Sequence, residues 1–559
     1  MKLSNALYLL PIAFLAAFYF YPLAAILQTS FAAGSGWTEI FTDLYYARVL
    51  VFTFVQAALS TLLTLALGLP AAYIFARYDF PGASIMRAIT TIPFLMPTII
   101  VATAFSALFG PRGIINLALI DLFHLDAPPI QILNTLWIIL LAHTFYNFTV
   151  VLRIVGGFWS NLDPQIENAA RVLGADRMRT FLHVTLPLIA PALIAAALLV
   201  FIFDFTSFGV VLILGGARLA TLEVEIYRQT VNLFDLPVAA ALSLVQLVCT
   251  FALMAIYTRL QAHLAQPLKL RPQAIIKRKP ASIAEKIFVW GYLAAMLTFL
   301  LTPLISVVVS SLASGTDYYS ELFINRRGSI TFVPPIDAVK NSLIFASLTV
   351  ILAVALGLIA AHSLMTDDRR PLTADRTKAR RSAVSGLRSI FASILDPLFM
   401  LPLGTSAVTL GFGYILTLGN LRTSIWLLPI AHALVAFPFV LRSLLPILRS
   451  IQPRLREAAQ LLGASPGHVW REIDFPIMMR AVIVGAVFAF TVSMGEFAAT
   501  TLIARPEMPT IPIAIYRLLG QPGMINLGQA LALSTILMVI SALAIIAMER
   551  FRIGEIGEF

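Results

Sequence analysis

The sequence predicts an all-α, polytopic membrane protein with about twelve transmembrane helices, arranged as two parallel six-helix repeats. Composition is the first reason: 59% of the 559 residues are hydrophobic and 12% are charged, with a mean hydropathy of +0.89. A soluble protein of this size does not need so apolar a chain. Duplication is the second reason. The stretch Pro164–Ala175 returns as Pro453–Ala464, and the same offset of 289 residues aligns Pro187 with Pro476.

Apolar stretches of about 20 residues are long enough to cross a bilayer as helices. The first stretch contains Pro11 and Pro22 and is long for a cleaved signal peptide, so we expect it to remain as a span. The first six predicted spans are Leu7–Leu27, Val51–Phe75, Ile89–Phe109, Ile132–Phe158, Leu188–Leu214 and Leu236–Tyr257. The second six are Ile287–Ser310, Ser342–Met365, Ile394–Leu418, Ile425–Leu448, Ile477–Leu502 and Leu527–Met548.

The spans divide the chain into a first half (residues 1–265), a basic linker rich in proline (266–286) and a second half (287–559). Each half holds one copy of the duplicated stretch, in loops 159–187 and 449–476. An even number of spans per half returns the chain to its starting side, which makes the repeats parallel. The halves differ in a long loop at Pro111–Gln131 and a charged insertion at Asp367–Arg388.

The positive charges predict the orientation. With both termini in the cytoplasm, 29 of the 39 Lys and Arg residues lie on the cytoplasmic side and 10 lie outside. Cytoplasmic loops of membrane proteins carry the excess of Lys and Arg. Both copies of the duplicated stretch are therefore expected to face the cytoplasm. The basic residues lie at span ends without interleaved aromatic residues, which argues against nucleic-acid binding.

Residue types in the duplicated stretch predict a helix, a turn and a second helix. Alanine pairs allow another helix to approach closely, and Gly174 and Gly463 suit the left-handed position that ends a helix. Pro187 and Pro476 suit the opening of the next helix.

This stretch resembles the cytoplasmic loop signature of permease subunits of binding-protein-dependent ABC importers, which runs Glu-Ala-Ala, three residues, Gly, and then a stretch ending near Leu-Pro. The second copy has Phe475 in place of the usual Leu. The first copy has Asn168 in place of the acid, and Glu167 precedes it. The resemblance assigns ATPase-coupling roles to these loop residues: Glu167, Asn168, Ala169, Ala170, Gly174, Leu186, Pro187, Glu457, Ala458, Ala459, Gly463 and Pro476.

The resemblance implies the type I importer permease fold and a coupling helix in each loop that docks on an ATP-binding subunit. It implies two copies of that subunit, an extracytoplasmic solute-binding protein, and a bacterial or archaeal cytoplasmic membrane. No Gly-Lys pair occurs in the chain, so a usual P-loop is absent, and we expect ATP and Mg²⁺ to bind the partner. We expect no cofactor, metal site or catalytic residue on this chain. Fused double permeases of this length most resemble those for ferric iron or thiamine. Polyamines, phosphonates and inorganic anions are alternative substrates.

Each half has one acid within or at the outer end of its fifth span. The translocation path is predicted to include Asp204, Ser207 and Glu496, because intramembrane acids usually face a cavity. Alternatively, the acids bond neighbouring backbone or helix ends. His143 and His432 occupy equivalent positions, and an inherited packing or hydrogen-bonding role is favoured over a metal or proton role.

Two other classes of function remain open on sequence grounds. An ion-coupled secondary transporter also uses twelve spans in two parallel halves, but it has no need of a docking loop after the fourth span. An intramembrane enzyme needs convergent polar residues from several spans, and this sequence offers few.

Overall fold

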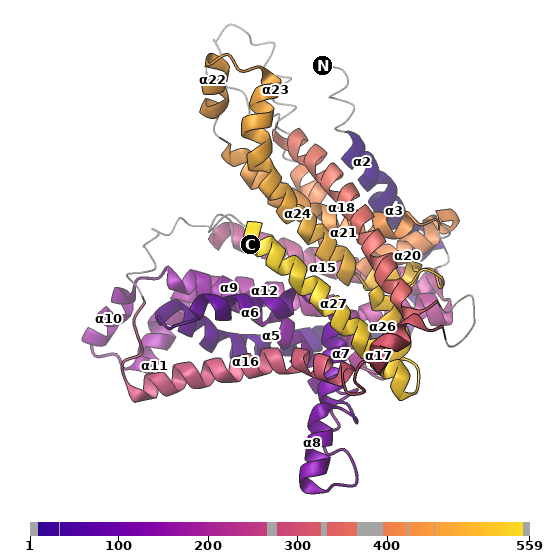
Figure 1. Ribbon diagram of the computed structural model, residues 1–559, viewed down its shortest axis with the longest axis horizontal. Helices are drawn as coiled ribbons and strands as arrows, with labels where there is room; N and C mark the ends of the chain where they lie inside the picture. The colour runs from indigo at the N-terminus through magenta and orange to yellow at the C-terminus, as the bar shows by residue number, and fades with distance from the viewer. Residues whose placement is uncertain are drawn as a thin grey trace. The chain divides into compact units, whose positions relative to one another are not determined.

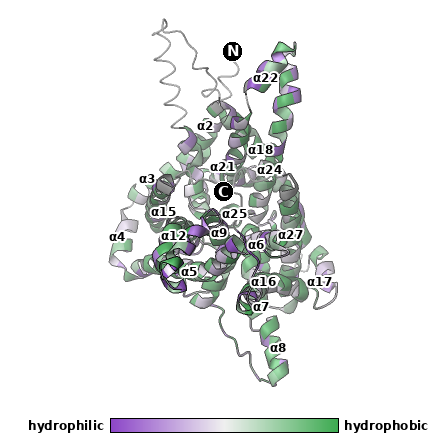
Figure 2. Cartoon of the chain, turned by 90° about the vertical axis from the view of Figure 1, so that its left-hand side faces the viewer, coloured by the Kyte–Doolittle hydropathy of each residue, from purple (hydrophilic) through white to green (hydrophobic). Residues whose placement is uncertain are grey.

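The computed structural model describes residues 9–32, 34–264, 277–325, 333–365, 395–421, 424–451 and 453–551. Within these ranges the chain forms helices and no β-strand, which confirms the all-α prediction. Eleven of the described helices are long and apolar enough to span a membrane. A bent pair, Leu395–Gly404 and Ala407–Thr417, meets at 96° and brings the number to twelve when counted as one span. The long helices are coloured mostly as hydrophobic in Figure 2.

The first half supplies its predicted spans and several short helices between them. The elements that make up most of the spans are α2 (Leu9–Leu15), η1 (Ala16–Phe20), α3 (Tyr21–Ala32), α5 (Leu44–Arg77), α7 (Thr98–Phe109), α9 (Leu136–Ser160), α12 (Leu186–Phe205) and α15 (Leu236–Leu264). The short elements are α4 (Ser35–Thr42), α6 (Ala83–Leu95), α8 (Ile114–Phe123), α10 (Pro164–Val172), α11 (Arg177–Thr180), η2 (Phe181–Thr185), α13 (Gly209–Leu214), α14 (Leu222–Arg228) and η3 (Gln229–Leu233).

The second half repeats this order. Its long elements are α16 (Ile283–Ser311), α18 (Pro335–Met365), α20 (Ala407–Thr417), α21 (Leu427–Ser450), α24 (Phe475–Gly495) and α27 (Met524–Phe551). Its short elements are α17 (Asp317–Ser320), η5 (Glu321–Phe323), η6 (Leu401–Gly404), η7 (Gly419–Leu421), α22 (Pro453–Leu461), α23 (Pro466–Val469), η8 (Trp470–Asp474), α25 (Ala498–Ile503) and α26 (Ile511–Leu519).

The third span of the first half is broken where we predicted one helix. Met96 is extended, with ψ of 137°, because a residue before a proline disfavours the helical region. Pro97 is the N-cap of α7, which begins at Thr98. The predicted loop Pro111–Gln131 also contains a helix, α8, which extends away from its neighbours in Figure 1. The insertion Asp367–Arg388 and most of the linker lie outside the described residues.

Both fifth spans also consist of two helices. Continuous helix runs from Arg177 to Phe205 and from Gly467 to Gly495, and the short helices α13 and α25 follow after a break. The predicted spans Leu188–Leu214 and Ile477–Leu502 therefore each contain an interruption of the helical hydrogen bonding. Discontinuous membrane helices leave backbone groups free at the break, and such groups must find partners within the protein.

The chain divides into two compact units that do not follow the sequence halves. One unit comprises Met1–Ala32, Leu322–Ala514 and Val539–Phe559, and the other comprises Ala33–Glu321 and Ile515–Met538. Each unit therefore takes the first span of the opposite half. In the first unit α3 packs on α20, and in the second α16 packs on α7.

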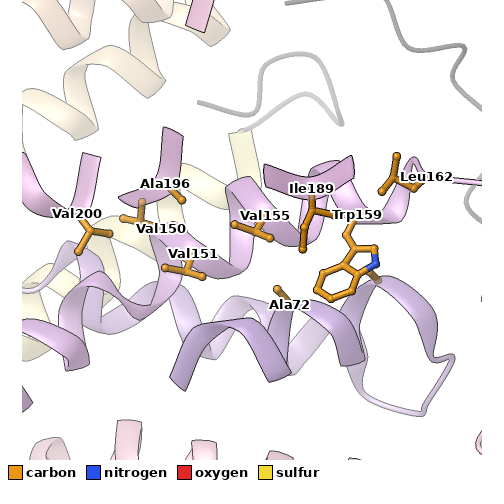
Figure 3. Close-up of a cluster of buried hydrophobic side chains, with 10 residues drawn as sticks. Ala72, Val150, Val151, Val155, Trp159, Leu162, Ile189, Ala196 and Val200 are labelled. Carbon is orange, nitrogen blue, oxygen red and sulfur yellow. The ribbon is translucent and has the colours of Figure 1, made fainter. Parts of the chain in front are cut away.

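Small residues bring the central helices of each unit together. In the second unit α5, α9 and α12 enclose a cluster that includes Ala72, Val151 and Trp159, whose side chains converge in Figure 3. A Cβ on Gly68 would lie 2.7 Å from the side chain of Val151. At the equivalent positions of the other unit, a Cβ on Gly357 would lie 2.7 Å from Val440. The same close crossing therefore exists twice, as tight helix packing in membranes requires.

Candidate functional site

The loop after the fourth span of the first half forms a short capped helix, α10. Its first turn begins with Asp163, whose side chain accepts a hydrogen bond from the Gln165 amide at 3.0 Å. Its end is set by Gly174, with φ of +91°, and by hydrogen bonds from the amides of Gly174 and Ala175 to the carbonyls of Arg171 and Ala170. This pair of bonds defines a Schellman motif, which needs the left-handed residue that glycine adopts without strain.

The corresponding loop of the second half ends its helix α22 in the same way. Gly463 has φ of +84°, and its amide donates to the Gln460 carbonyl at 3.0 Å. The Ala464 amide donates to the Ala459 carbonyl, also at 3.0 Å. The two predicted loop glycines thus occupy identical turns, and the sequence repeat is also a repeat of local structure.

Both helices present an exposed face and an apolar tip. Asn168 and Ala169 in the first copy, and Glu457 and Ala458 in the second, are exposed. At each tip two large apolar side chains are almost fully exposed: Val172 (87%), Leu173 (88%), Leu461 (88%) and Leu462 (89%). We call these pairs the loop tips. Figure 1 shows α10 beyond the ends of α9 and α12, and α22 beyond the end of α24. Exposed apolar side chains in repeated positions indicate a protein-binding surface.

Glu167 points back onto its own chain rather than outward. Its carboxylate accepts hydrogen bonds from the Arg77 guanidinium at 2.9 Å and from the Thr185 hydroxyl at 3.1 Å. Arg77 also donates to the Leu162 carbonyl at 3.0 Å. This arrangement attaches α10 to the end of α5 and to the start of the fifth span. Asn168 therefore takes the outward position that Glu457 takes in the second copy.

An ion pair of reversed polarity braces the second loop. Arg456 and Asp474, which are equivalent by the 289-residue offset to Glu167 and Thr185, are joined by a guanidinium–carboxylate contact of 2.7 Å. Sequence reasoning missed Arg77, Arg456 and Asp474. Arg456 and Asp474 could have been found in the sequence, because opposite charges stand 18 residues apart in the second copy and not at the equivalent positions of the first.

The remaining predicted loop residues lie where the fifth spans begin. Leu186 and Pro187 start α12 directly after the π-helical turn η2, and Pro476 lies in the first turn of α24 after η8. The helix is already continuous before these prolines, so they do not open it as predicted; each instead follows directly on a π-helical turn, where the regular helical hydrogen bonding is interrupted. These residues set the direction in which the loop meets the membrane helix.

Residues at the end of the linker pack near Arg77 within the second unit. The Arg278 amide donates to the Arg77 carbonyl at 3.1 Å, and the Asp79 amide donates to the Arg278 carbonyl at 3.0 Å. The Arg278 guanidinium lies 4.9 Å from the centre of the Tyr78 ring. Burial raises the pKa of Tyr78 to about 12. The linker end, the end of α5 and the first loop are thus connected through adjacent residues.

A second group of predicted residues lies buried at the break in the fifth span of the first half. His143 on α9 contacts the Ser60 hydroxyl through Nδ1 at 3.0 Å and the Ser207 hydroxyl through Nε2 at 2.8 Å. Asp204 lies in the last turn of α12, and its Oδ1 is 3.4 Å from His143 Nδ1. All of these side chains are buried.

The second half builds the equivalent site with its polar residues exchanged. His432 contacts the hydroxyls of Ser493 at 2.7 Å and Thr500 at 2.8 Å, and Glu496 lies 3.4 Å from its Nε2. By the repeat offset Asp204 corresponds to Ser493, and Ser207 corresponds to Glu496. Each histidine therefore contacts one acid and two hydroxyl groups. The acid lies in the last turn of α12 in the first half and directly after α24 in the second half.

The acids do not form a metal-binding cluster with other ligands. Among the described residues no group of three or more His, Cys, Asp and Glu side chains is arranged to hold a metal ion.

Comparison with known proteins supports the repeat and the family. The family model "Binding-protein-dependent transport system inner membrane component" matches residues 65–268 and again 382–552. The thiamine transport system permease protein ThiP of Escherichia coli K12 is 25% identical over 87% of this chain and 85% of its own length. ThiP of Brucella abortus strain 2308 is 27% identical over 92% of this chain and 90% of its own length. The putative 2-aminoethylphosphonate permease PhnU of Salmonella paratyphi A is 28% identical over 44% of this chain and 88% of its own length.

One matched segment falls in each half of the chain, and each contains one loop helix and one broken fifth span. The two ThiP relatives align across both halves of this chain. The chain is therefore a multi-pass, fused double permease that belongs to the family of inner membrane components of binding-protein-dependent transport systems.

Proposed function

We propose that this permease imports a thiamine-like solute, delivered by an extracytoplasmic binding protein, and that ATP hydrolysis on separate subunits drives the import. The two loop helices with their exposed tips carry this proposal. Each tip presents apolar side chains that a partner has to cover, and each helix is fixed to the start of a fifth span. Movement of the docked subunits is thereby transmitted directly to the broken helices.

Two ATP-binding subunits fit the duplicated loops, one on each. ATP and Mg²⁺ are bound by those subunits. Both loops, both termini and the linker lie in the cytoplasm in this proposal, as the distribution of Lys and Arg predicts. The outer ends of the spans receive the solute from the binding protein.

Thiamine is the best supported solute because the ThiP relatives align over nearly the whole of this chain. The phosphonate permease relative aligns over less than half of it. Phosphonate is therefore the second candidate, and ferric iron remains an expectation from the sequence resemblance alone. Polyamines and inorganic anions have no support among the named relatives.

Of the three residues predicted to line the path, we retain Asp204 as the one that meets the solute. Ser207 holds His143, and Glu496 accepts hydrogen bonds from backbone amides at the start of α25. The proposal therefore assigns structural roles, without contact to the solute, to Ser207 and Glu496.

Uptake by reconstituted vesicles tests this function. The full chain is inserted into proteoliposomes with its ATP-binding subunit and binding protein, and radiolabelled thiamine is added outside with ATP inside. We expect uptake that requires ATP and stops with vanadate. Uptake that ignores vanadate and instead follows an imposed ion gradient would favour the secondary transporter.

A loop-tip variant, Leu461→Glu with Leu462→Glu, separates docking from folding in the same assay. Placing two charges on the apolar tip should lower co-purification of the ATP-binding subunit and uptake about tenfold or more. The matched control is Phe323→Glu in η5, whose side chain is also exposed (67%) but lies outside both loops and outside the candidate spans. Equal losses in both variants would reject the docking role.

A further inference from the structure

Asp204 is a buried carboxylate with one oxygen that lacks a partner. It lies in the last turn of α12 and is 0% exposed. Its Oδ1 accepts hydrogen bonds from Asn147 Nδ2 at 2.7 Å and from the Tyr146 hydroxyl at 3.4 Å. Its Oδ2 is buried and has no hydrogen-bond partner among the described residues. Buried polar atoms are almost always satisfied, so an unsatisfied carboxylate oxygen calls for a missing group.

Two further oxygens around Asp204 share this property. Gln56 donates from Nε2 to the Asp204 carbonyl at 2.7 Å, and Asn147 donates to the carboxylate. The other atom of each amide, Gln56 Oε1 and Asn147 Oδ1, is buried without a hydrogen-bond partner within the described ranges. Three acceptor oxygens are thus unsatisfied, one on Asp204 and one on each of the two amide side chains that donate to this residue. The missing group must supply donors or positive charge.

The surrounding charges point to a positive group. Asp204 is at the carboxyl end of α12, where the helix dipole is negative and a carboxylate is disfavoured. The titratable groups that face it are His143 and Tyr146. Both ring nitrogens of His143 have hydroxyl partners, so the ring needs no charge to be satisfied. No Lys or Arg side chain among the described residues forms an ion pair with Asp204.

The second half provides an internal comparison. Glu496 accepts hydrogen bonds from the Ala499 amide at 2.8 Å and from the Thr500 amide at 2.9 Å, and its second oxygen also accepts from the Thr500 hydroxyl. These amides belong to the first turn of α25, where a helix dipole favours negative charge. Both oxygens of Glu496 are therefore satisfied by the protein, whereas Asp204 has an open oxygen at the unfavourable end of a helix.

We propose that the Asp204 carboxylate, with the amide oxygens of Asn147 and Gln56, forms a subsite for a monovalent cationic group in the first half of the permease. This inference deepens the proposed function and rests on it for the identity of the solute. Thiamine carries a permanent positive charge on its thiazolium ring, which matches the chemistry of the subsite. A free monovalent cation such as Na⁺ has the same charge and is the other source. Half-helix carboxyl ends beside unwound backbone are known to coordinate cations in transporters.

Asp204→Asn tests the subsite because it removes the charge and keeps the shape. The full transport complex is purified, and equilibrium binding of thiamine and of its neutral deaza analogue is measured, each with Na⁺ or the bulky N-methylglucamine as the buffer cation. The melting temperature of the complex is also measured in both buffers. We expect Asp204→Asn to weaken thiamine binding about 10- to 100-fold, the range for losing a hydrogen-bonded charge pair. Binding of the neutral analogue should change less than about twofold by the same reasoning, since it makes no charge pair.

Glu496→Gln is the matched variant, a buried acid at the equivalent break. It should lower the melting temperature of the complex through the lost cap, with thiamine affinity unchanged. Asn147→Leu removes one amide oxygen and leaves the acid, and it replaces Asp204→Asn if that variant does not fold. It should also weaken binding of thiamine more than binding of the neutral analogue.

The outcomes distinguish the two cation sources and the two proposals. Loss of thiamine affinity supports the subsite with the solute as its ligand, and loss of a Na⁺-induced rise in melting temperature supports it with a free cation. The proposal is overturned if the Asp204 and Asn147 variants match the wild type in thiamine affinity and Na⁺ response, or if thiamine and its neutral analogue lose affinity equally while the Na⁺ response is kept. A wild-type complex that binds no thiamine rejects the proposed solute, while the Na⁺ comparison still tests the subsite.

Discussion

Glu167 and Arg456 occupy equivalent positions in the two loops and hold their helices by opposite charges. Glu167 meets Arg77, and Arg456 meets Asp474. At the span breaks the acid and the hydroxyl have likewise exchanged places around His143 and His432. These positions require a charged or hydrogen-bonded contact, and the acid can stand on either side of that contact.

A charge exchange at the second loop tests this interpretation. Arg456→Glu places two acids together, and we expect faster amide hydrogen exchange across α22 in that variant because the bond to Asp474 is lost. The pair is partly buried, with side chains 19% and 17% exposed, so the loss should amount to about 1 kcal/mol. Arg456→Glu combined with Asp474→Arg should restore slow exchange.

Arg471→Glu is the control for this comparison, because its side chain is 79% exposed and lies in the same loop. It should leave the exchange of α22 amides unchanged. A double variant that exchanges as fast as Arg456→Glu would show that the pair does not brace the helix.

At the scale of the element, each loop helix is short and depends on its ends. Isolated helices of nine residues are unstable in water, so caps and anchors must define α10 and α22. The Schellman turns at Gly174 and Gly463 determine where each helix stops and therefore where each tip projects. No other atom lies within 4 Å of a Cβ built on either glycine, so only the backbone conformation restricts these positions.

Substitution of Gly463 should therefore follow the cost of a left-handed residue rather than side-chain size. Gly463→Val should destabilise the turn by about 1–2 kcal/mol or more and lower co-purification of the ATP-binding subunit. Gly463→Asn should retain most of the association, because asparagine tolerates this conformation. Pull-down of the subunit from membranes measures both. Equal association of the valine variant and the wild type would contradict the assigned role of the turn.

At the scale of the whole molecule, the two compact units each contain helices from both halves of the sequence. The first span, through α3, packs with α20, and α16 packs with α7. In the second unit the Ser306 hydroxyl on α16 donates to the Ala104 carbonyl on α7 at 3.2 Å. Neither half of the sequence therefore holds a complete unit.

Separated halves should then depend on each other. Residues 1–270 and 271–559, expressed as two chains, should co-purify from the same membrane and be degraded when expressed alone, because each lacks a span that its unit requires. Quantitative immunoblotting with and without the other half measures this dependence. A half that accumulates alone and unfolds cooperatively would argue against the exchange of first spans.

Sequence alone determined a large part of this protein. The apolar stretches determined the helical class and the spans, because bilayer thickness dictates helix length. The duplicated stretch determined the two loop helices, since Gly174 and Gly463 mark their ends by a purely local requirement on the backbone. These features depend on neighbours in the chain, and a single sequence contains that information.

Tertiary structure decided which polar residues meet. Asp204 and Glu496 look alike in the sequence. Glu496 accepts hydrogen bonds from the amino end of a helix, whereas Asp204 lies at the carboxyl end of a helix beside Gln56 and Asn147. Arg77 reaches Glu167 across 90 residues of chain, and the first spans pack against elements of the opposite half. Such contacts depend on how distant helices cross, and helix crossings are decided by packing across the whole fold rather than by any local pattern.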